Sequence, residues 1–310
     1  MAERTEFTFK SRDGKNDIHA VKWVPSDREP RAVLQIVHGM IEYVERYDLF
    51  ASYMADQGFV VVGEDHLGHG HTAKTDEDLG YFTKHDAKTV IVRDVNRLRK
   101  ITEEEYRGLP YFIYGFSMGS FIVRKYITMY GKGLAGVIIG GTGQRDRLTL
   151  DVGIAVCSIM ALIKGDHYRS RFVQKMAFNG YLKKIDSPRT GSDWLCTDNN
   201  IVDAYRADKY CTFMFTLNAF KTMFSIIKYD GNAANVALVP KDLPIFIASG
   251  EDDPVGGYGK EVMKVFDLFK SQGIENVKVK LYNNMRHEIH NEKEKHIVFI
   301  DFLDWMEECI

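Results

Sequence analysis

The chain has 310 residues, enough for one domain with an insertion or for two small domains, each with a buried core. Its hydrophobic content of 45% and charged content of 27% are typical of a soluble globular protein, and a net charge of −2 without a dense Lys/Arg block gives no support for a nucleic-acid partner. No apolar run approaches the roughly 20 residues that span a bilayer, and the charged start lacks the apolar core of a signal peptide.

Strand-like and helix-like patterns alternate in the first half of the chain. Period-two alternation over residues 5–10 and 18–24, separated by an Asp-Gly turn signal, predicts an antiparallel hairpin. Short apolar runs then predict buried strands, and apolar residues three or four apart predict the helices between them. This alternation is typical of a parallel, doubly wound sheet. The expected strands are 32–37, 59–63, 111–114 and 134–139, and the expected helices are 47–55, 90–101 and 121–129.

The alternation stops after residue 141. Segments 152–164, 170–178 and 208–229 are predicted as consecutive helices joined by polar, turn-rich stretches. Strand and helix patterns resume at 244–249, 260–271, 277–282 and 294–308. We therefore expect an α/β fold with an eight-stranded, mostly parallel sheet and helices on both of its faces. Residues 1–144 and 239–310 would form this core, and residues 145–238 a helical cap inserted into it.

The segment Gly115-Phe116-Ser117-Met118-Gly119 matches the G-x-S-x-G pattern of a nucleophilic serine. It lies where a predicted strand ends and a predicted helix begins. Such a tight turn strains its central residue and leaves little room for side chains at the flanking positions, so glycine fits at both. The turn would present the Ser117 hydroxyl beside a helix N-terminus, which favours negative charge. The alternative is a glycine-rich loop with a capping serine.

A serine hydroxyl needs a base, and the base needs an orienting acid. His287 follows the last predicted strand and is the expected base. His290 and His296 lie at or inside the next helical pattern, so we expect both at the surface. Asp253 follows the preceding strand and is the expected acid, with Asp252 as the alternative within a run of three acids.

Two backbone N–H groups must stabilise the oxyanion that forms when a serine attacks a carbonyl. Met118, directly after the nucleophile, is predicted to provide one. Met40 is predicted to provide the other, because its loop follows a buried strand and reaches the same end of the sheet. His38, two residues earlier, is expected to be a structural loop residue rather than a second base.

Several segments in combination carry a family resemblance. They are His38-Gly39 with Glu42, Arg46 and Tyr47; Asp65-His66-x-Gly68-His69-Gly70-x-Thr72; Gly115 to Gly119; Asp193-Trp194-Leu195; Ala207-Asp208; Ser249-Gly250-x-Asp252-Asp253-Pro254; and Arg286-His287-Glu288. With them the chain resembles, over nearly its whole length, the monoglyceride lipase/lysophospholipase family of α/β-hydrolases, which is commonly grouped with serine aminopeptidases.

The resemblance implies a serine hydrolase that cleaves carboxylic esters. It implies Ser117, Asp253 and His287 as the catalytic triad, in the chain order serine, acid, histidine of α/β-hydrolases. It also implies Met40 and Met118 as oxyanion donors, and the helical insertion as a lid over an acyl-binding pocket. The chain departs from the family at Ile41 and Tyr43, where Gly and His are common.

Residues 210–227 carry a dense apolar set that covers more than one face of the predicted helix. Part of it must pack on the core, and the rest would line an acyl pocket or touch a lipid surface. Phe213, Phe220 and Phe224 are the candidate pocket residues, with Met160 on a second wall. The expected substrate is a single-chain lipid ester, such as a monoacylglycerol or lysophospholipid. The alternatives are short esters for a general carboxylesterase, an aminopeptidase substrate, and a non-catalytic ligand receptor.

No cofactor or metal is expected. The sequence has no P-loop and no G-x-G-x-x-G motif. His66, His69 and His71 are clustered, but they occupy a short glycine-rich loop without a cysteine to complete a usual zinc set. The four cysteines are sparse and lack CxxC spacing, which favours a reducing cytoplasm. The expected partners are the small ester or lipid and, transiently, a membrane surface.

Overall fold

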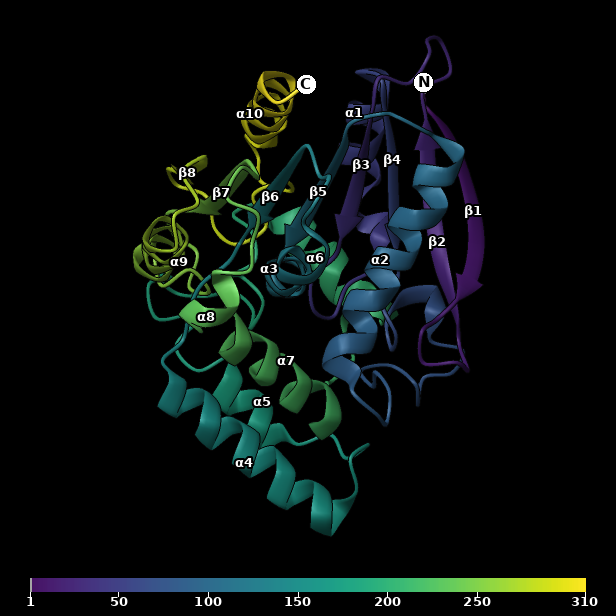
Figure 1. The fold of residues 1–310 in the computed structure, drawn as a ribbon. Coiled ribbons are helices and arrows are strands. Elements are labelled where there is room, and N and C mark those ends of the chain that lie inside the picture. The colour runs from purple at the N-terminus through teal and green to yellow at the C-terminus, as the bar shows by residue number, and fades with distance from the viewer. Residues whose placement is uncertain (1) are drawn as a thin grey trace.

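The computed structural model describes residues 2–310, whose eight strands form one sheet (Figure 1). The spatial order of the strands is β1-β2-β4-β3-β5-β6-β7-β8. β1 and β2 form the predicted antiparallel hairpin, β2 is also antiparallel to β4, and the other neighbours are parallel. The predicted sheet is confirmed. Its strands are β1 (Glu3–Lys10), β2 (Asp17–Val24), β3 (Ala32–Val37), β4 (Phe59–Glu64), β5 (Tyr111–Phe116), β6 (Gly136–Gly140), β7 (Ile245–Gly250) and β8 (Val277–Tyr282).

Helices cover both faces of this sheet. Side chains of one strand alternate between two cores, as in β3, where Val33 and Val37 face one core and Leu34 and Ile36 face the other. Every residue of β3 to β7 is buried, which explains the largely apolar runs in the sequence. One face is covered by α1 (Asp48–Asp56) and α10 (Lys295–Glu308), and the other by α2 (Ala87–Glu105), α3 (Met118–Tyr130) and α9 (Lys260–Ser271).

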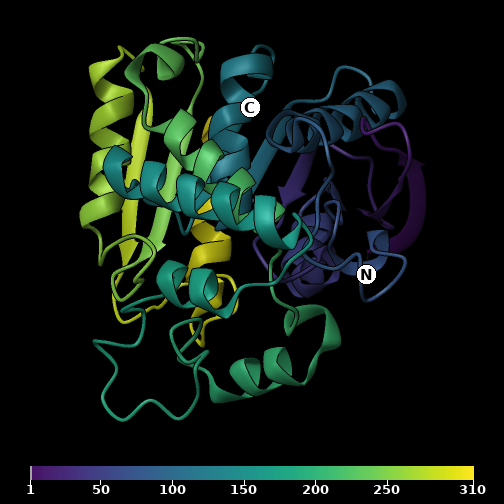
Figure 2. The same cartoon turned by 90° about the horizontal axis from the view of Figure 1, so that it is seen from below.

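Between β6 and β7 the chain leaves the sheet and forms a run of helices past the carboxyl ends of the parallel strands (Figures 1 and 2). The first and longest of them packs on α7, which in turn contacts α3 of the core. Asp146, Ser170 and Thr216 each accept a hydrogen bond from the backbone N–H three residues further on, and so begin α4, α5 and α7. The run contains α4 (Arg147–Lys164), α5 (Arg171–Ala177), α6 (Asn199–Ala207), η3 (Lys209–Cys211), α7 (Leu217–Asp230) and α8 (Ala233–Val236).

The sequence pattern predicts this helical segment but not all of its helices. It does not predict α6, which Asp198 caps and in which Val202 is the buried residue. The helix predicted from residue 208 begins at Leu217, because the Thr216 side chain caps it there. The cap boundaries at residues 145 and 238 stay a prediction. Over residues 2–310, no helix combines the length and the apolar character needed to cross a bilayer.

Candidate active site

Ser117 lies at the sharp turn between β5 and α3. Its φ of 51° and ψ of −117° are strained for a residue other than glycine. The flanking glycines make this turn possible. A Cβ on Gly119 would collide with the carbonyl oxygen of Val37, and one on Gly115 would lie 2.6 Å from the carbonyl oxygen of Gly119. The glycines of the sequence motif therefore meet a steric requirement of the turn.

His287 and Asp253 approach Ser117 from the loops after β8 and β7. His287 Nε2 lies 2.8 Å from Ser117 Oγ, and His287 Nδ1 lies 2.9 Å from Asp253 Oδ2. Asp253 is fully buried and also accepts hydrogen bonds from the Ser249 hydroxyl at 3.0 Å and the Val255 N–H at 2.8 Å. Because this carboxylate faces Nδ1, it favours a proton there and leaves Nε2 free to accept the serine proton.

The alternative acid and the other histidines lie apart from this chain of hydrogen bonds. Asp252 is exposed, and so is His296, as predicted. His290 is buried, so its predicted surface position is wrong. Its ring stacks on Tyr47 with centroids 4.6 Å apart, and its Nδ1 lies 3.2 Å from the Tyr114 hydroxyl. Burial lowers the pKa of His290 to about 3, which makes it a neutral core residue.

The loop after β3 lies against Ser117. A Cβ on Gly39 would lie only 3.1 Å from the Ser117 Cβ, so glycine permits this approach. Met40 and Met118, the predicted oxyanion donors, line the same cavity as Ser117. Met118 begins α3, so its N–H has no hydrogen-bond acceptor within the helix. The helix dipole also favours an anion at this end of α3.

His38 holds this loop in place. Its Nε2 lies 3.0 Å from the backbone N–H of His66, which makes Nε2 the acceptor. The proton therefore sits on Nδ1, which donates to the carbonyl oxygen of Gly39 at 2.8 Å. Burial lowers the pKa of His38 well below its usual range, and it lowers those of His66 and His69 to about 3 and about 4. Within residues 2–310, no group of three His, Cys, Asp or Glu side chains is arranged to hold a metal.

A buried charge network connects the loop after β3 to the loop that carries His287. Glu42 accepts hydrogen bonds from the Gly39 N–H at 2.5 Å and from Arg46 at 2.7 Å. Arg46 also donates twice, at 2.9 and 2.7 Å, to Glu288, the residue after His287. Burial opposes ionisation of Glu288, but the Arg46 guanidinium outweighs it and lowers the pKa of Glu288. No role for this network follows from the sequence alone, although its three charged residues all belong to the motifs of the family resemblance.

Ser117 opens into an inner cavity of about 380 Å³ between the sheet and the inserted helices. Phe220 and Phe224, both on α7, line it. Met160 does not: it is partly buried against the core, with its sulfur 4.0 Å from the Ser170 hydroxyl, because its side of α4 faces α5 rather than the cavity. The other apolar lining residues include Phe121, Leu150, Met176, Met223, Ile227 and Val255.

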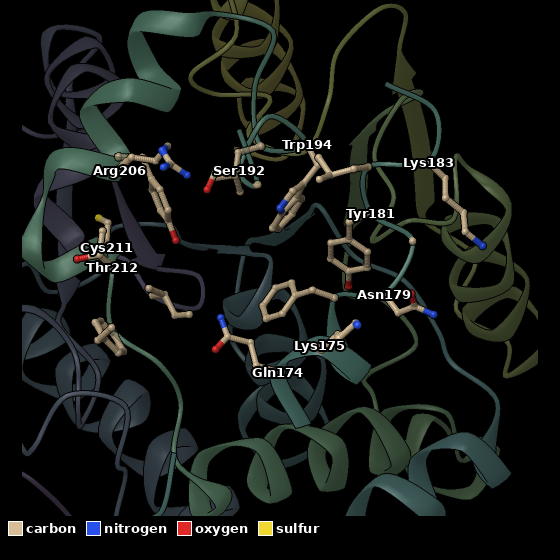
Figure 3. Close-up of a pocket in the computed structure, with 18 residues that line it drawn as sticks. Gln174, Lys175, Asn179, Tyr181, Lys183, Ser192, Trp194, Arg206, Cys211 and Thr212 are labelled. Carbon is tan, nitrogen blue, oxygen red and sulfur yellow. The ribbon is translucent and has the colours of Figure 1, made fainter. Parts of the chain in front are cut away.

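A second, outer cavity of about 770 Å³ adjoins the first (Figure 3). Phe213 lines this outer cavity rather than the inner one, and its ring packs on His69 with centroids 5.4 Å apart. Trp194 lines both cavities, and its ring centroid lies 5.1 Å from that of His287. The other residues shared by the two walls are Ile41, Phe178, Asn179, Tyr181, Leu195 and Tyr205.

Comparisons with known proteins agree with this geometry. A model of the family described as serine aminopeptidase, S33 matches residues 28–294. The chain belongs to this family. It is 24% identical to a monoacylglycerol lipase from Mycolicibacterium smegmatis over 309 aligned residues. The alignment covers 98% of this chain and 97% of that protein. It is 23% identical to the monoglyceride lipase of Mus musculus, over 87% of this chain and 79% of that protein.

Solved structures give the same fold. A highly thermostable carboxyl esterase from Bacillus coagulans, solved with glycerol, is 30% identical with a TM-score of 0.92, over 100% of this chain and 99% of that one. A lipase solved in an open form is 26% identical with a TM-score of 0.90, over 99% of both chains. This S33 protein is thus an α/β-hydrolase of the monoglyceride lipase family. It is an ester hydrolase similar to monoacylglycerol lipases and carboxylesterases.

Proposed function

We propose that this ester hydrolase works through an acyl-enzyme on Ser117. The observation that supports this proposal most directly is the hydrogen-bond chain from Asp253 through His287 to the Ser117 hydroxyl. His287 takes the Ser117 proton as the oxygen attacks the ester carbonyl, and the N–H groups of Met40 and Met118 hold the oxyanion. His287 then protonates the leaving alcohol and activates the water that cleaves the acyl-enzyme.

We propose a single-chain lipid ester, a monoacylglycerol or a lysophospholipid, as the substrate. Support comes from the largely apolar wall of the inner cavity, which suits one acyl chain, and from the named activities of the mycobacterial and mouse relatives. The full-length likeness to the Bacillus coagulans carboxyl esterase favours a second candidate, a general carboxylesterase that acts on short soluble esters.

Covalent labelling tests the mechanism. A fluorophosphonate should label the wild-type chain but not Ser117→Ala, and that variant should lose about 10⁶-fold in kcat. Ser271→Ala, which removes an exposed hydroxyl from the end of α9, is the matched control and should keep both label and activity. A folded wild-type chain that remains unlabelled would contradict the mechanism and favour a ligand receptor.

A series of p-nitrophenyl esters of increasing acyl length tests the substrate. We expect kcat/KM to rise with acyl length up to a medium or long chain, because each buried methylene adds about 0.8 kcal/mol of favourable transfer energy. A maximum at the shortest acyl groups would instead favour the carboxylesterase.

We also propose that the outer face of α4 rests transiently on a lipid surface. This face carries Leu148, Ile159, Leu162 and Ile163, which are 74%, 59%, 87% and 75% exposed. An apolar stripe of this kind on one helix suits an interface with lipid, and Arg147 is among the cations beside it. The opposite face of α4 contributes to the inner cavity, so a lipid would have a short path from the surface to Ser117.

Vesicles of phosphatidylcholine with phosphatidylglycerol test this contact. Leu162→Ser with Ile163→Ser should weaken co-sedimentation with the vesicles and leave hydrolysis of a soluble p-nitrophenyl ester unchanged. Ile297→Ser with Ile300→Ser, on the exposed side of α10, is the matched control. Equal vesicle binding by both double variants would contradict the contact.

For location we propose the cytoplasm. All four cysteines are free, and three of them are buried. Unpaired cysteines suit a reducing compartment.

A further inference from the structure

We propose that the outer cavity binds a phosphate group carried by the leaving alcohol of the ester. Acylglycerol phosphates would then be better substrates than neutral acylglycerols of the same acyl length. The inference rests on the proposed function, since it assigns the leaving-group side of the same site.

The main support for this inference is the positive charge of the outer cavity. Its wall contains Lys175, Lys183 and Arg206 and no carboxylate. Across the described chain, residues 2–310, none of these three cations has an ion-pair partner. Figure 3 shows the Arg206 side chain extending over the cavity toward Ser192, whereas the Lys183 ammonium points away from it. A cleft lined by charge of one sign raises the local concentration of ligands of the opposite sign.

Carboxylates on the same segments are engaged elsewhere and do not neutralise this charge. Asp203, on α6 with Arg206, pairs with Arg189 at 2.9 Å. Asp208 accepts a hydrogen bond from the Tyr43 hydroxyl at 2.8 Å. The Arg206 guanidinium is therefore available to a ligand, and its planar fork matches the oxygens of a phosphate.

An unsatisfied polar atom lies in the same wall. Gln174 Oε1 is buried and has no hydrogen-bond partner among the described residues. Buried polar atoms of this kind are normally satisfied by protein, water or a ligand.

The position of the cavity assigns it to the leaving group rather than to the acyl chain. His287 must donate its proton to the leaving oxygen, and the Trp194 ring beside it forms part of both walls. In the proposed step the bond from Ser117 Oγ to the acyl carbon forms and the ester C–O bond breaks. The proton on His287 passes to the glycerol oxygen, and the phosphate ester itself stays intact. The acyl chain remains in the inner cavity while the glycerol phosphate leaves through the outer one.

Two substrates that differ only in the phosphate test the proposal: 1-octanoylglycerol 3-phosphate and 1-octanoylglycerol, both below their micelle concentrations. The wild-type chain should prefer the phosphate ester in kcat/KM by about tenfold, and Arg206→Gln should remove most of that preference, because a charge-assisted hydrogen bond is lost. The preference should change less than about twofold in Arg171→Gln, the matched control, an exposed cap arginine outside both cavity walls. High salt should weaken the preference in the wild-type chain.

The proposal would be overturned if kcat/KM for the neutral ester equalled that for the phosphate ester in both the wild type and Arg206→Gln. Inhibition by inorganic phosphate without any preference for the phosphate ester would also overturn it, because it would indicate a site for a free anion.

Failure of the proposed function would be seen separately, as no hydrolysis of either ester. Calorimetric titration of both esters into Ser117→Ala would then decide the inference. Tighter binding of the phosphate ester that Arg206→Gln abolishes would support it, and equal binding would overturn it.

Discussion

The triad and the cavity walls are built in different ways. Asp253 and His287 are buried on the loops that follow β7 and β8, and each makes hydrogen bonds with defined partners. In the inserted segment, Phe224 and Trp194 are half-buried, and Arg206 is exposed. We therefore expect the polar geometry of the core to determine the reaction, and the packing and charge of the inserted helices to determine the substrate. Changes in the first region should abolish turnover, and changes in the second should redistribute it among substrates.

Asp253→Asn should give the largest effect. An amide that donates to His287 Nδ1 would favour the wrong imidazole tautomer, and we expect a loss of about 10⁴-fold in kcat. Asp252→Asn, one residue away and exposed, should change kcat by less than about twofold. Steady-state kinetics on p-nitrophenyl butyrate, with circular dichroism as a check on folding, would measure both. Equal losses in the two variants would contradict the assignment of the acid.

Arg46→Met should be next, because it leaves Glu42 and Glu288 buried without their cation. We expect a loss of about 3–5 kcal/mol in the free energy of unfolding, measured in urea. Arg31→Met removes an exposed ion pair with Glu307 and should cost no more than about 1 kcal/mol. Similar losses for the two arginines would show that the buried network does not hold the loop after β3 and the His287 loop together.

The contrast between the buried core and the inserted helices also explains which features can be predicted from the sequence. The strands β3 to β7 can be predicted because burial on both faces requires largely apolar runs, and the first two strands because they alternate polar and apolar residues. The position of Ser117 can be predicted because the turn excludes side chains beside the serine. The orientation of Met160 and the burial of His290 could not be predicted, since both depend on how other segments pack against them: α5 for Met160, and the Tyr47 ring for His290. α6 is missed because its nine residues are fewer than the window of about 11 to 18 residues over which apolar spacing identifies a helix.

Asp230, the last residue of α7, carries a buried carboxyl that should make the stability of the inserted segment depend on pH. Its carboxylate is buried with no hydrogen-bond partner in the described part of the chain, and burial raises its pKa to about 8. Between about pH 4 and pH 8 the folded state holds a proton that the unfolded state has released. This group's contribution to stability is therefore present at low pH and is lost as the pH rises toward 8, by at most about 1.4 kcal/mol per pH unit.

Asp230→Asn should remove this loss, so the variant should gain stability relative to the wild type between pH 5 and pH 8. Urea unfolding at several pH values would measure the difference. Asp242→Asn, at an exposed position, should differ from the wild type by the same amount at every pH. A difference for Asp230→Asn that does not vary with pH would contradict the buried, protonated carboxyl.

The smallest effects should come from the wall of the inner cavity, and they should have opposite signs. A Cβ on Gly153 would lie 2.9 Å from the Phe224 ring, so Gly153→Ala should push that ring into the cavity and favour shorter acyl chains. Phe224→Ala should enlarge the cavity and favour longer ones. We expect changes of about tenfold in the ratio of kcat/KM for long and short esters, since one methylene in a hydrophobic pocket is worth about 1–3 kcal/mol. Val152→Ala, on the exposed side of α4, is the control for helix stability. Shifts in the same direction for Gly153→Ala and Phe224→Ala would show that this wall does not select substrates by acyl length. The inserted helices would then not determine substrate choice in the way proposed.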